Sequence, residues 1–273
     1  MGIQENRWRP RQVLSAAMLL VVLTGCGGPG APVKQTAQFL GPTQPLGEGS
    51  ARTYVLADRD GHPSEVGIRL TATAMAGLPD ADKGQPVMLS FPPQAPGTVF
   101  THVMLNWNPH GHDPVALYGR PHFDVHFDMV DHAAIAAITP NDPDYATKAA
   151  HLPDPKYVPR DYIIPPGPPV AVQAVPGMGL HLTDGTDKTL VPGSYDFTRI
   201  FINGTWDGQY TFMEPMLTRA WLLTKPNLPV EPIKQPLAYQ RTGYYPTTFA
   251  VHFDDRANEY VIALGGLTMR TAS

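Results

Sequence analysis

From residue 51 onward, apolar and polar residues alternate with a period near two, and Gly, Pro or Asp interrupts the alternation about every ten residues. A period of two is typical of strands whose two faces differ in environment, because successive side chains point to opposite sides. Many short strands with regular turns favour a sandwich or a barrel. We therefore predict an all-β domain over residues 51–273, mainly an antiparallel sandwich or barrel-like, with one or two short helices and long loops.

The turn residues delimit the predicted strands. These cover residues 52–57, 65–73, 86–91, 99–107, 122–130, 169–175, 180–182, 196–202, 210–213, 219–224, 247–253 and 260–264. The clearest helical segment is 132–138, which Pro140 ends because proline disrupts the helical hydrogen bonds. Residues 139–169 are polar and rich in proline, so we expect a long surface loop that covers a site.

The first 25 residues have the parts of a secretory signal peptide. Arg7, Arg9 and Arg11 precede an apolar run over residues 13–23, which is too short to cross a bilayer. The segment ends in Leu-Thr-Gly-Cys at residues 23–26, which resembles the lipobox of bacterial lipoprotein signal peptides. The resemblance implies cleavage before Cys26 and lipidation of its thiol. An ordinary signal peptide with a chance cysteine, or a short buried helix, is the alternative.

Cys26 is the only cysteine, so the chain forms no internal disulfide, and lipidation explains a lone thiol in an exported protein. Residues 26–50 are rich in Gly, Pro and Gln without a period, and we interpret them as a flexible tether. We expect an extracytoplasmic protein of the cell envelope that its lipid anchors to the membrane, on the periplasmic side of the outer membrane in a Gram-negative cell. The net charge of −4 argues against a nucleic-acid partner, which calls for a basic surface.

Histidine is concentrated in one part of the chain. Six of the ten histidines lie between residues 102 and 132. On a strand, His122, Asp124, His126 and Asp128 share one face, while Phe and Val side chains occupy the other. We expect the aromatic face to enter the core and the His/Asp face to line solvent or a polar cavity.

Imidazole and carboxylate together suit a divalent metal such as zinc or iron. Strand residues two apart lie about 6.6 Å from each other, whereas residues four apart lie about 13 Å apart. A flat strand therefore supports joint ligation by His122 and Asp124, or by Asp124 and His126. Three residues elsewhere in the chain could complete the set: His112, His181 and Glu214. The alternative is a hydrogen-bonded network of histidines that holds no metal.

Five short motifs follow one another along the chain. They are Glu-Val-Gly-Ile-Arg-Leu at 65–70 with Gly-Leu-Pro at 77–79, Gly-His-Asp-Pro at 111–114, Pro-His-Phe-Asp-Val-His-Phe at 121–127, Gly-Met-Gly-Leu-His at 177–181, and Asp-Gly at 207–208 with Glu-Pro-Met at 214–216. Together they resemble an uncharacterised family of exported bacterial proteins, some described as hydrolases, with a His-Phe-Asp-x-His-Phe signature. Asp113 and Asp128 depart from the family pattern, which has Glu and an aromatic residue there. The resemblance implies one metal-binding site made by His112, His122, His126, His181 and Glu214.

Two functions are compatible with these features. The first is a membrane-anchored lipoprotein whose metal site binds or hydrolyses a small ligand. The second is a non-catalytic structural or interaction module of the cell envelope, in which the histidines are purely architectural. The His-x-Asp…His triad of iron oxygenases is matched by His122, Asp124 and His181 in spacing alone. Motifs for a serine nucleophile, a phosphate-binding loop and a His-Glu-x-x-His zinc site are missing from the sequence.

Overall fold

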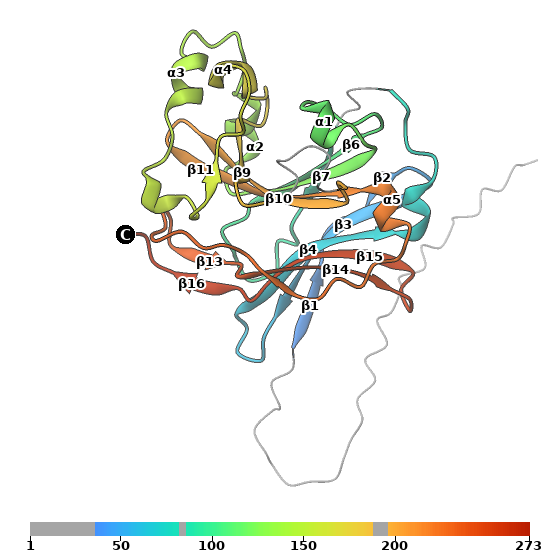
Figure 1. Ribbon diagram of the computed structural model, residues 1–273. Helices are drawn as coiled ribbons and strands as arrows, with labels where there is room; N and C mark the ends of the chain where they lie inside the picture. Colours follow the sequence, from blue (N-terminus) through green and yellow to red (C-terminus); the bar gives the residue numbers. More distant parts are fainter. Residues whose placement is uncertain (1–35, 82–85, 188–195) are drawn as a thin grey trace, which may run out of the picture. The chain divides into compact units, whose positions relative to one another are not determined.

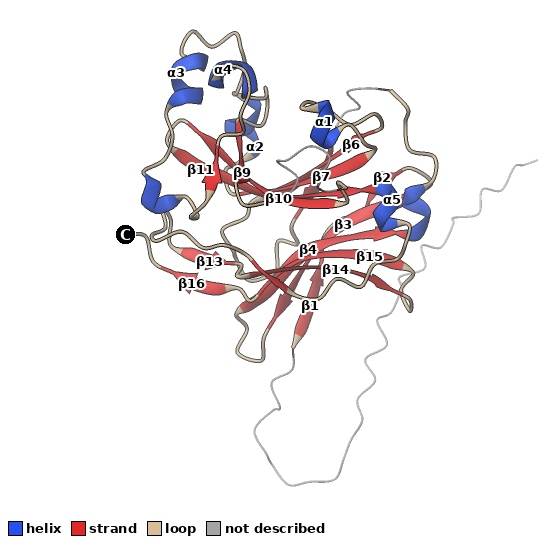
Figure 2. Ribbon diagram, viewed as in Figure 1, coloured by secondary structure: helices blue, strands red, loops and turns tan. Residues whose placement is uncertain are grey.

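The computed structural model describes residues 36–81, 86–187 and 196–273, and the structural statements below concern these ranges. Within them the chain forms two seven-stranded sheets and one two-stranded sheet, and neighbouring strands pair antiparallel. Strands dominate and the helices are short (Figure 2). The predicted all-β class with antiparallel sheets is confirmed.

The first sheet has the order β1-β3-β4-β15-β14-β12, with β2 beside β3. Its strands are β1 (Ala37–Leu40), β2 (Gln44–Leu46), β3 (Gly49–Ala57), β4 (Pro63–Thr71), β12 (Glu231–Pro232), β14 (Thr248–Asp254) and β15 (Glu259–Gly265). The sheet thus begins at Ala37, whereas the sequence pattern places the start of the folded body at residue 51. The side chains of β1 are mostly exposed and β2 has only three residues, so neither strand has a hydrophobic alternation long enough to be recognised, and both pair with β3 through backbone hydrogen bonds.

The second sheet has the order β5-β6-β7-β11-β10-β9-β8. Its strands are β5 (Val87–Ser90), β6 (His102–Asn108), β7 (His122–Asp128), β8 (Tyr162–Ile163), β9 (Leu180–Asp184), β10 (Arg199–Trp206) and β11 (Gln209–Thr218). The small sheet pairs β13 (Gly243–Tyr245) with β16 (Thr268–Arg270). Strand β7 lies inside the second sheet, between β6 and β11, so both of its edges are hydrogen-bonded.

One main hydrophobic core takes side chains from both large sheets. Alternate residues of β4, such as Ile68 and Leu70, enter it from the first sheet, and Phe123, Val125 and Phe127 of β7 enter it from the second. All five are fully buried. Burial of aromatic and branched side chains is the main favourable contribution to folding, so this core holds the two sheets together and sets which face of β7 points inward.

The helices are α1 (Val115–Tyr118), α2 (His132–Ala136), α3 (Tyr145–Ala150), α4 (Val170–Gln173) and α5 (Arg219–Leu222), with 3-10 turns η1 (Ala72–Met75) and η2 (Pro155–Tyr157). The segment between β7 and β9 carries α2, α3 and α4 (Figure 1). Its apolar side chains form a separate small core around Ile135 and Tyr145. In the described ranges, no helix has the length and apolar character that crossing a bilayer requires.

Two predicted strands are helices. The range 219–224 contains α5, whose first turn is capped by the hydroxyl of Thr218 accepting from the backbone N–H of Trp221. The range 169–175 contains α4, which starts directly after Pro169. Both segments are short apolar runs, for which periodicity does not distinguish a strand from a single helical turn. The predicted loop over 139–169 includes α3, η2 and β8. The predicted signal peptide and Cys26 lie outside the described residues.

Candidate metal centre

Strand β7 presents four polar side chains on the face of its sheet that points away from the main core. These are His122, Asp124, His126 and Asp128, all buried. The apolar side chains between them belong to the main core and hold the register, since a slip by one residue would exchange the two faces. Buried imidazoles and carboxylates need partners, so the neighbours of these four residues determine what this face can do.

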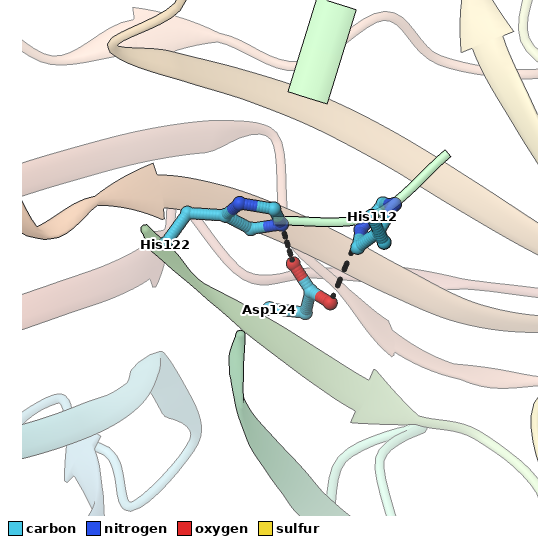
Figure 3. A group of neighbouring side chains, drawn as sticks. All are labelled: His112, His122 and Asp124. Atoms are coloured by element: carbon cyan, nitrogen blue, oxygen red, sulfur yellow. Dashed lines mark ion pairs between the residues drawn. The ribbon is translucent and has the colours of Figure 1, made fainter. Parts of the chain in front are cut away.

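The first triad joins His122 and Asp124 of β7 to His112, which lies in the connection between β6 and α1 (Figure 3). The Nε2 atom of His122 lies 3.0 Å from Oδ1 of Asp124, and Nε2 of His112 lies 3.5 Å from Oδ2. One carboxylate thus faces two imidazoles, with one oxygen toward each. His122 and Asp124 are buried, whereas the side chain of His112 is 39% exposed.

The backbone decides which ring nitrogens of this triad are free. Nδ1 of His122 lies 2.6 Å from the carbonyl oxygen of Arg120, and Nδ1 of His112 lies 2.8 Å from that of Asp113. A carbonyl only accepts, so both Nδ1 atoms must carry the proton and donate it. In the neutral rings both Nε2 atoms therefore point a lone pair at the carboxylate of Asp124. Two acceptors in contact repel each other, and a proton or a metal ion between them removes the repulsion.

Two further contacts shape the carboxylate of Asp124. The side-chain amide of Asn108 donates to its Oδ2 at 2.7 Å. Burial alone would raise the pKa of Asp124, but the imidazoles of His112 and His122 outweigh burial and hold the pKa well below its ordinary value. Burial tends to lower the pKa of His112, but the neighbouring carboxylate of Asp124 outweighs it, so the pKa lies above its ordinary value. Asp124 is therefore ionised across the physiological range, which is the state that metal ligation requires.

The second triad joins His126 of β7, His181 of β9 and Glu214 of β11. The Nε2 atom of His126 lies 3.4 Å from Oε1 of Glu214, and Nε2 of His181 lies 3.5 Å from Oε2. The arrangement repeats that of the first triad, with one carboxylate facing two imidazoles. Both ring nitrogens of His126 and Oε2 of Glu214 are buried and make no hydrogen bond.

Burial controls the charge state of the second triad. It lowers the pKa of His126 to about 4 and that of His181 to about 3, with His126 as a further cause for His181. Burial, together with the charges of Asp124 and Asp128, raises the pKa of Glu214 well above its ordinary value. At neutral pH the two imidazoles are therefore uncharged, and each has a nitrogen lone pair to offer.

Gly204 makes room for this second triad. It lies on β10 opposite both His181 of β9 and Phe212 of β11. The ring of Phe212 packs over Gly204, and a Cβ at this position would lie 2.1 Å from Cε1 of that ring. The same ring makes edge contacts with His126 and His181, at centroid distances of 4.7 and 5.1 Å. The absence of a side chain at Gly204 thus allows Phe212 to support two candidate ligands.

A buried pair that the sequence analysis did not assign lies next along β7. His102 of β6 is paired with Asp128 in the β6–β7 register, and its Nε2 lies 3.2 Å from Oδ2 of Asp128. Burial raises the pKa of Asp128 to about 8. The sequence analysis also missed Asn108, the donor to Asp124. Both residues could have been found only from the pairing register of β6 with β7, which no local pattern supplies.

All six predicted site residues are brought onto one face of the second sheet, but they form two groups and not one site. The separation of His122 from His126 follows the strand-spacing argument, because each belongs to a different triad. His181 groups with His126 and Glu214, so the oxygenase-like combination of His122, Asp124 and His181 does not assemble. His132, His151 and His252, which the sequence analysis did not assign to the site, also lie outside the two groups.

The donor atoms of each triad lie within 4.8 Å of one another. Zinc binds nitrogen and oxygen at about 2.0–2.2 Å, which places tetrahedral ligand atoms about 3.3–3.6 Å from one another. The imidazole–carboxylate distances in the two triads run from 3.0 to 3.5 Å. Nε2 of His122 and Oδ1 of Asp124 are buried without a hydrogen bond, as are the atoms of the second triad named above. These buried His, Asp and Glu groups could hold a metal ion.

Comparisons with known proteins cover only part of the chain. A family model described as TTHB210-like (hypothetical protein TTHB210) matches residues 58–107. The matched range includes β4, β5 and most of β6, and it ends before His112 and the other five candidate ligands. No curated protein and no solved structure matches the chain. The chain is thus similar to the TTHB210-like family over one segment, which contains none of the residues of the two triads.

Proposed function

We propose that this protein is an exported lipoprotein, anchored at Cys26, that binds a divalent metal ion through His112, His122 and Asp124 and presents it to a small ligand. The observation that carries the proposal is the orientation of the two imidazoles. Each Nδ1 donates to a backbone carbonyl, and each Nε2 faces Asp124 at 3.0 or 3.5 Å. Hydrogen bonds that fix the ligating tautomer in this way are characteristic of metal-binding histidines.

The surrounding residues match what such a site requires. Asn108 orients the carboxylate of Asp124, and the carbonyls of Arg120 and Asp113 orient the rings. Zinc and iron both accept two imidazoles and one carboxylate. A divalent metal bound there would supply Lewis-acid chemistry. The ligand types favour zinc or iron over calcium or magnesium, which prefer oxygen.

The exposure of His112 supports a reactive site over a closed one. Its side chain is 39% exposed, while those of the other two residues are buried, so the triad meets solvent on the His112 side. Catalytic metal sites use three protein ligands and leave a position for water or substrate. Three protein ligands and one accessible side agree with binding, or hydrolysis, of a small ligand that approaches past His112.

The proposed anchor would keep this site near the membrane. The first strand begins at Ala37, and Cys26 precedes it by 11 residues. A fully extended chain spans at most about 3.6 Å per residue, so the folded part would start within about 40 Å of the lipid. Replacing Cys26 with Ser should abolish incorporation of a labelled fatty acid and release the protein from membranes. A wild-type chain that incorporates no label would contradict the proposed anchoring.

The metal site is tested by elemental analysis of the full-length chain, purified in detergent and dialysed after loading with Zn²⁺. We expect the His112→Ala variant to lose one equivalent of zinc, and the His110→Ala variant to keep the wild-type content. His110 is the matched control because it lies in the same connection and its side chain is also exposed. A wild-type protein with less than about a tenth of an equivalent would refute the proposal.

The full burial of His122 favours a second candidate function, a structural module of the cell envelope without bound metal. In that case His122→Ala lowers the melting temperature, but zinc neither binds nor stabilises the wild-type protein. A melting temperature that rises with zinc in the wild type, and not in His112→Ala, would favour the metal site over this alternative.

A further inference from the structure

We infer that the second triad, formed by His126, His181 and Glu214, is a cation site of its own, so that the chain has separate sites for two divalent metal ions. The proposed function concerns the first triad alone. The second site does not depend on it, because the two triads share no residue. The ion would be a transition metal of the zinc type, since two of the three donors are imidazole nitrogens.

The first argument is the set of buried polar atoms without partners. Both ring nitrogens of His126 and Oε2 of Glu214 lack a hydrogen bond, although His126 and Glu214 are almost completely buried. The imidazoles of His126 and His181 face the two oxygens of Glu214 at 3.4 and 3.5 Å. Buried polar atoms are nearly always paired in folded proteins, and unpaired ones call for an explanation. A cation between the two imidazoles and the carboxylate would pair with Nε2 of His126 and with Oε2 of Glu214 at once.

The second argument is that three separate strands build this arrangement. Glu214 lies on β11 between Phe212, which is paired with Asp128, and Met216, which is paired with Asp124, so it lies alongside His126 of β7. His181 comes from β9, on the far side of β10. It reaches the triad across β10 at Gly204, the residue that carries no side chain.

Phe212 holds the two imidazoles in place. Its ring contacts His126 and His181 edge to face and fills the space above Gly204. Phe212 is fully buried. Side chains locked by packing lose little freedom when they bind a ligand, so this support prepares the triad for an ion.

The spacing of the histidines along β7 separates the two triads. His122 and His126 are four residues apart on β7, which corresponds to about 13 Å along the strand. Asp124 lies between them, but its carboxylate faces the first triad, with Oδ1 toward His122 and Oδ2 toward His112 and Asn108.

The two sites differ in their access to solvent. His126 and Glu214 are buried and the side chain of His181 is 21% exposed, against 39% for His112 in the first triad. The second ion would tie β7, β9 and β11 together on the outer face of their sheet, with less access to solvent than the first.

The experiment measures zinc and cobalt equivalents bound to the full-length chain in detergent, after metal removal and reloading with each metal alone. We expect about two equivalents for the wild type and one for His181→Ala, with the remaining Co²⁺ still visible by its absorption. Glu214→Gln conserves the shape of the side chain, so it serves as a second variant if His181→Ala does not fold. It should also bind one equivalent of metal. His112→Ala should keep the second site and bind one equivalent. His62 precedes β4 in the first sheet and belongs to neither triad, so the control variant His62→Ala should bind two equivalents.

Several outcomes would overturn the inference. A single equivalent that is lost in both His112→Ala and His181→Ala would show one shared ion. Two equivalents retained in both His181→Ala and Glu214→Gln, or no metal in the wild type, would exclude the second site. One equivalent that survives His112→Ala but not His181→Ala or Glu214→Gln would support the second site and contradict the proposed function of the first.

Discussion

Replacing Gly204 with Ala should disturb the second triad without touching any of its ligands. A Cβ at residue 204 would lie 2.1 Å from Cε1 of Phe212 and 2.3 Å from both Cδ1 and Cζ. Carbon atoms in van der Waals contact are about 3.5–4.0 Å apart. The ring would therefore have to move by at least about 1 Å. Phe212 is fully buried and touches His126 and His181, so its movement would displace both imidazoles.

The size of the effect follows from the packing. Extra carbon atoms in a well-packed interior cost about 1–3 kcal/mol. In a domain of 150–250 residues each kcal/mol corresponds to about 2–4 °C in melting temperature, so Gly204→Ala should lower it by about 2–12 °C. We also expect the bound zinc to fall by up to one equivalent, because a displacement of this size moves the donor atoms out of reach of a common ion.

The assay is thermal unfolding followed by circular dichroism, with zinc content measured on the same samples. The double variant Gly204→Ala/Phe212→Leu provides the control, since leucine lacks the outer ring atoms that the new Cβ would meet. It should recover part of the stability that Gly204→Ala loses, relative to Phe212→Leu alone. The reasoning is refuted if Gly204→Ala melts within about 1 °C of the wild type and keeps all its zinc, or if the two substitutions are simply additive.

Three further predictions test other parts of the structure. Phe127→Ala removes a fully buried ring from the main core and should lower the free energy of unfolding, measured with urea, by about 3–5 kcal/mol. The control Leu237→Ala changes a side chain that is 91% exposed and should alter this free energy by less than about 0.5 kcal/mol. Equal effects of the two substitutions would contradict the assigned core. Asn108→Ala removes the hydrogen-bond donor to Asp124 and should weaken zinc binding about 10- to 100-fold in a chelator competition. An unchanged affinity would show that this hydrogen bond does not orient the ligand. Burial lowers the pKa of His126 to about 4 in the folded protein, whereas its pKa in the unfolded chain is about 6.5. Without metal, the folded state is therefore most stable above pH 6.5, where the ring is neutral in both states, and it loses stability as the pH falls toward 4. Relative to the wild type, metal-free His126→Gln should therefore gain stability between pH 6.5 and 4 in urea unfolding, and a constant difference would rule out the lowered pKa.

The fold class was predictable because sheet proteins leave a strong local signal. Alternation over β3, β4, β7, β14 and β15 located these strands correctly, and the spacing of turn residues indicated a sandwich. The pattern failed where backbone pairing or capping decides. Strand β1 has mostly exposed side chains, β2 has only three residues, and α5 owes its start to the hydroxyl of Thr218. These segments depend on hydrogen bonds with partners that the local sequence does not reveal.

The sequence by itself determined the polar face of β7. Alternation forces His122 and His126 onto the side opposite Phe123 and Phe127, because successive side chains of a strand point in opposite directions. On a flat strand it also placed these two histidines about 13 Å apart, although the family resemblance implied one site that contains both. The predicted export signal and the lipidation of Cys26 depend on the leader alone and stay predictions.

Only the tertiary structure decided how the six candidate ligands are divided. Their grouping into two triads depends on the order of β9, β10, β11 and β7 in the sheet, and on a glycine at the one position where a side chain would block Phe212. Strand order is set by long-range packing and hydrogen bonding between segments distant in the chain. A local pattern records which way a side chain points, but not which side chain it meets, and so it could not separate one site from two.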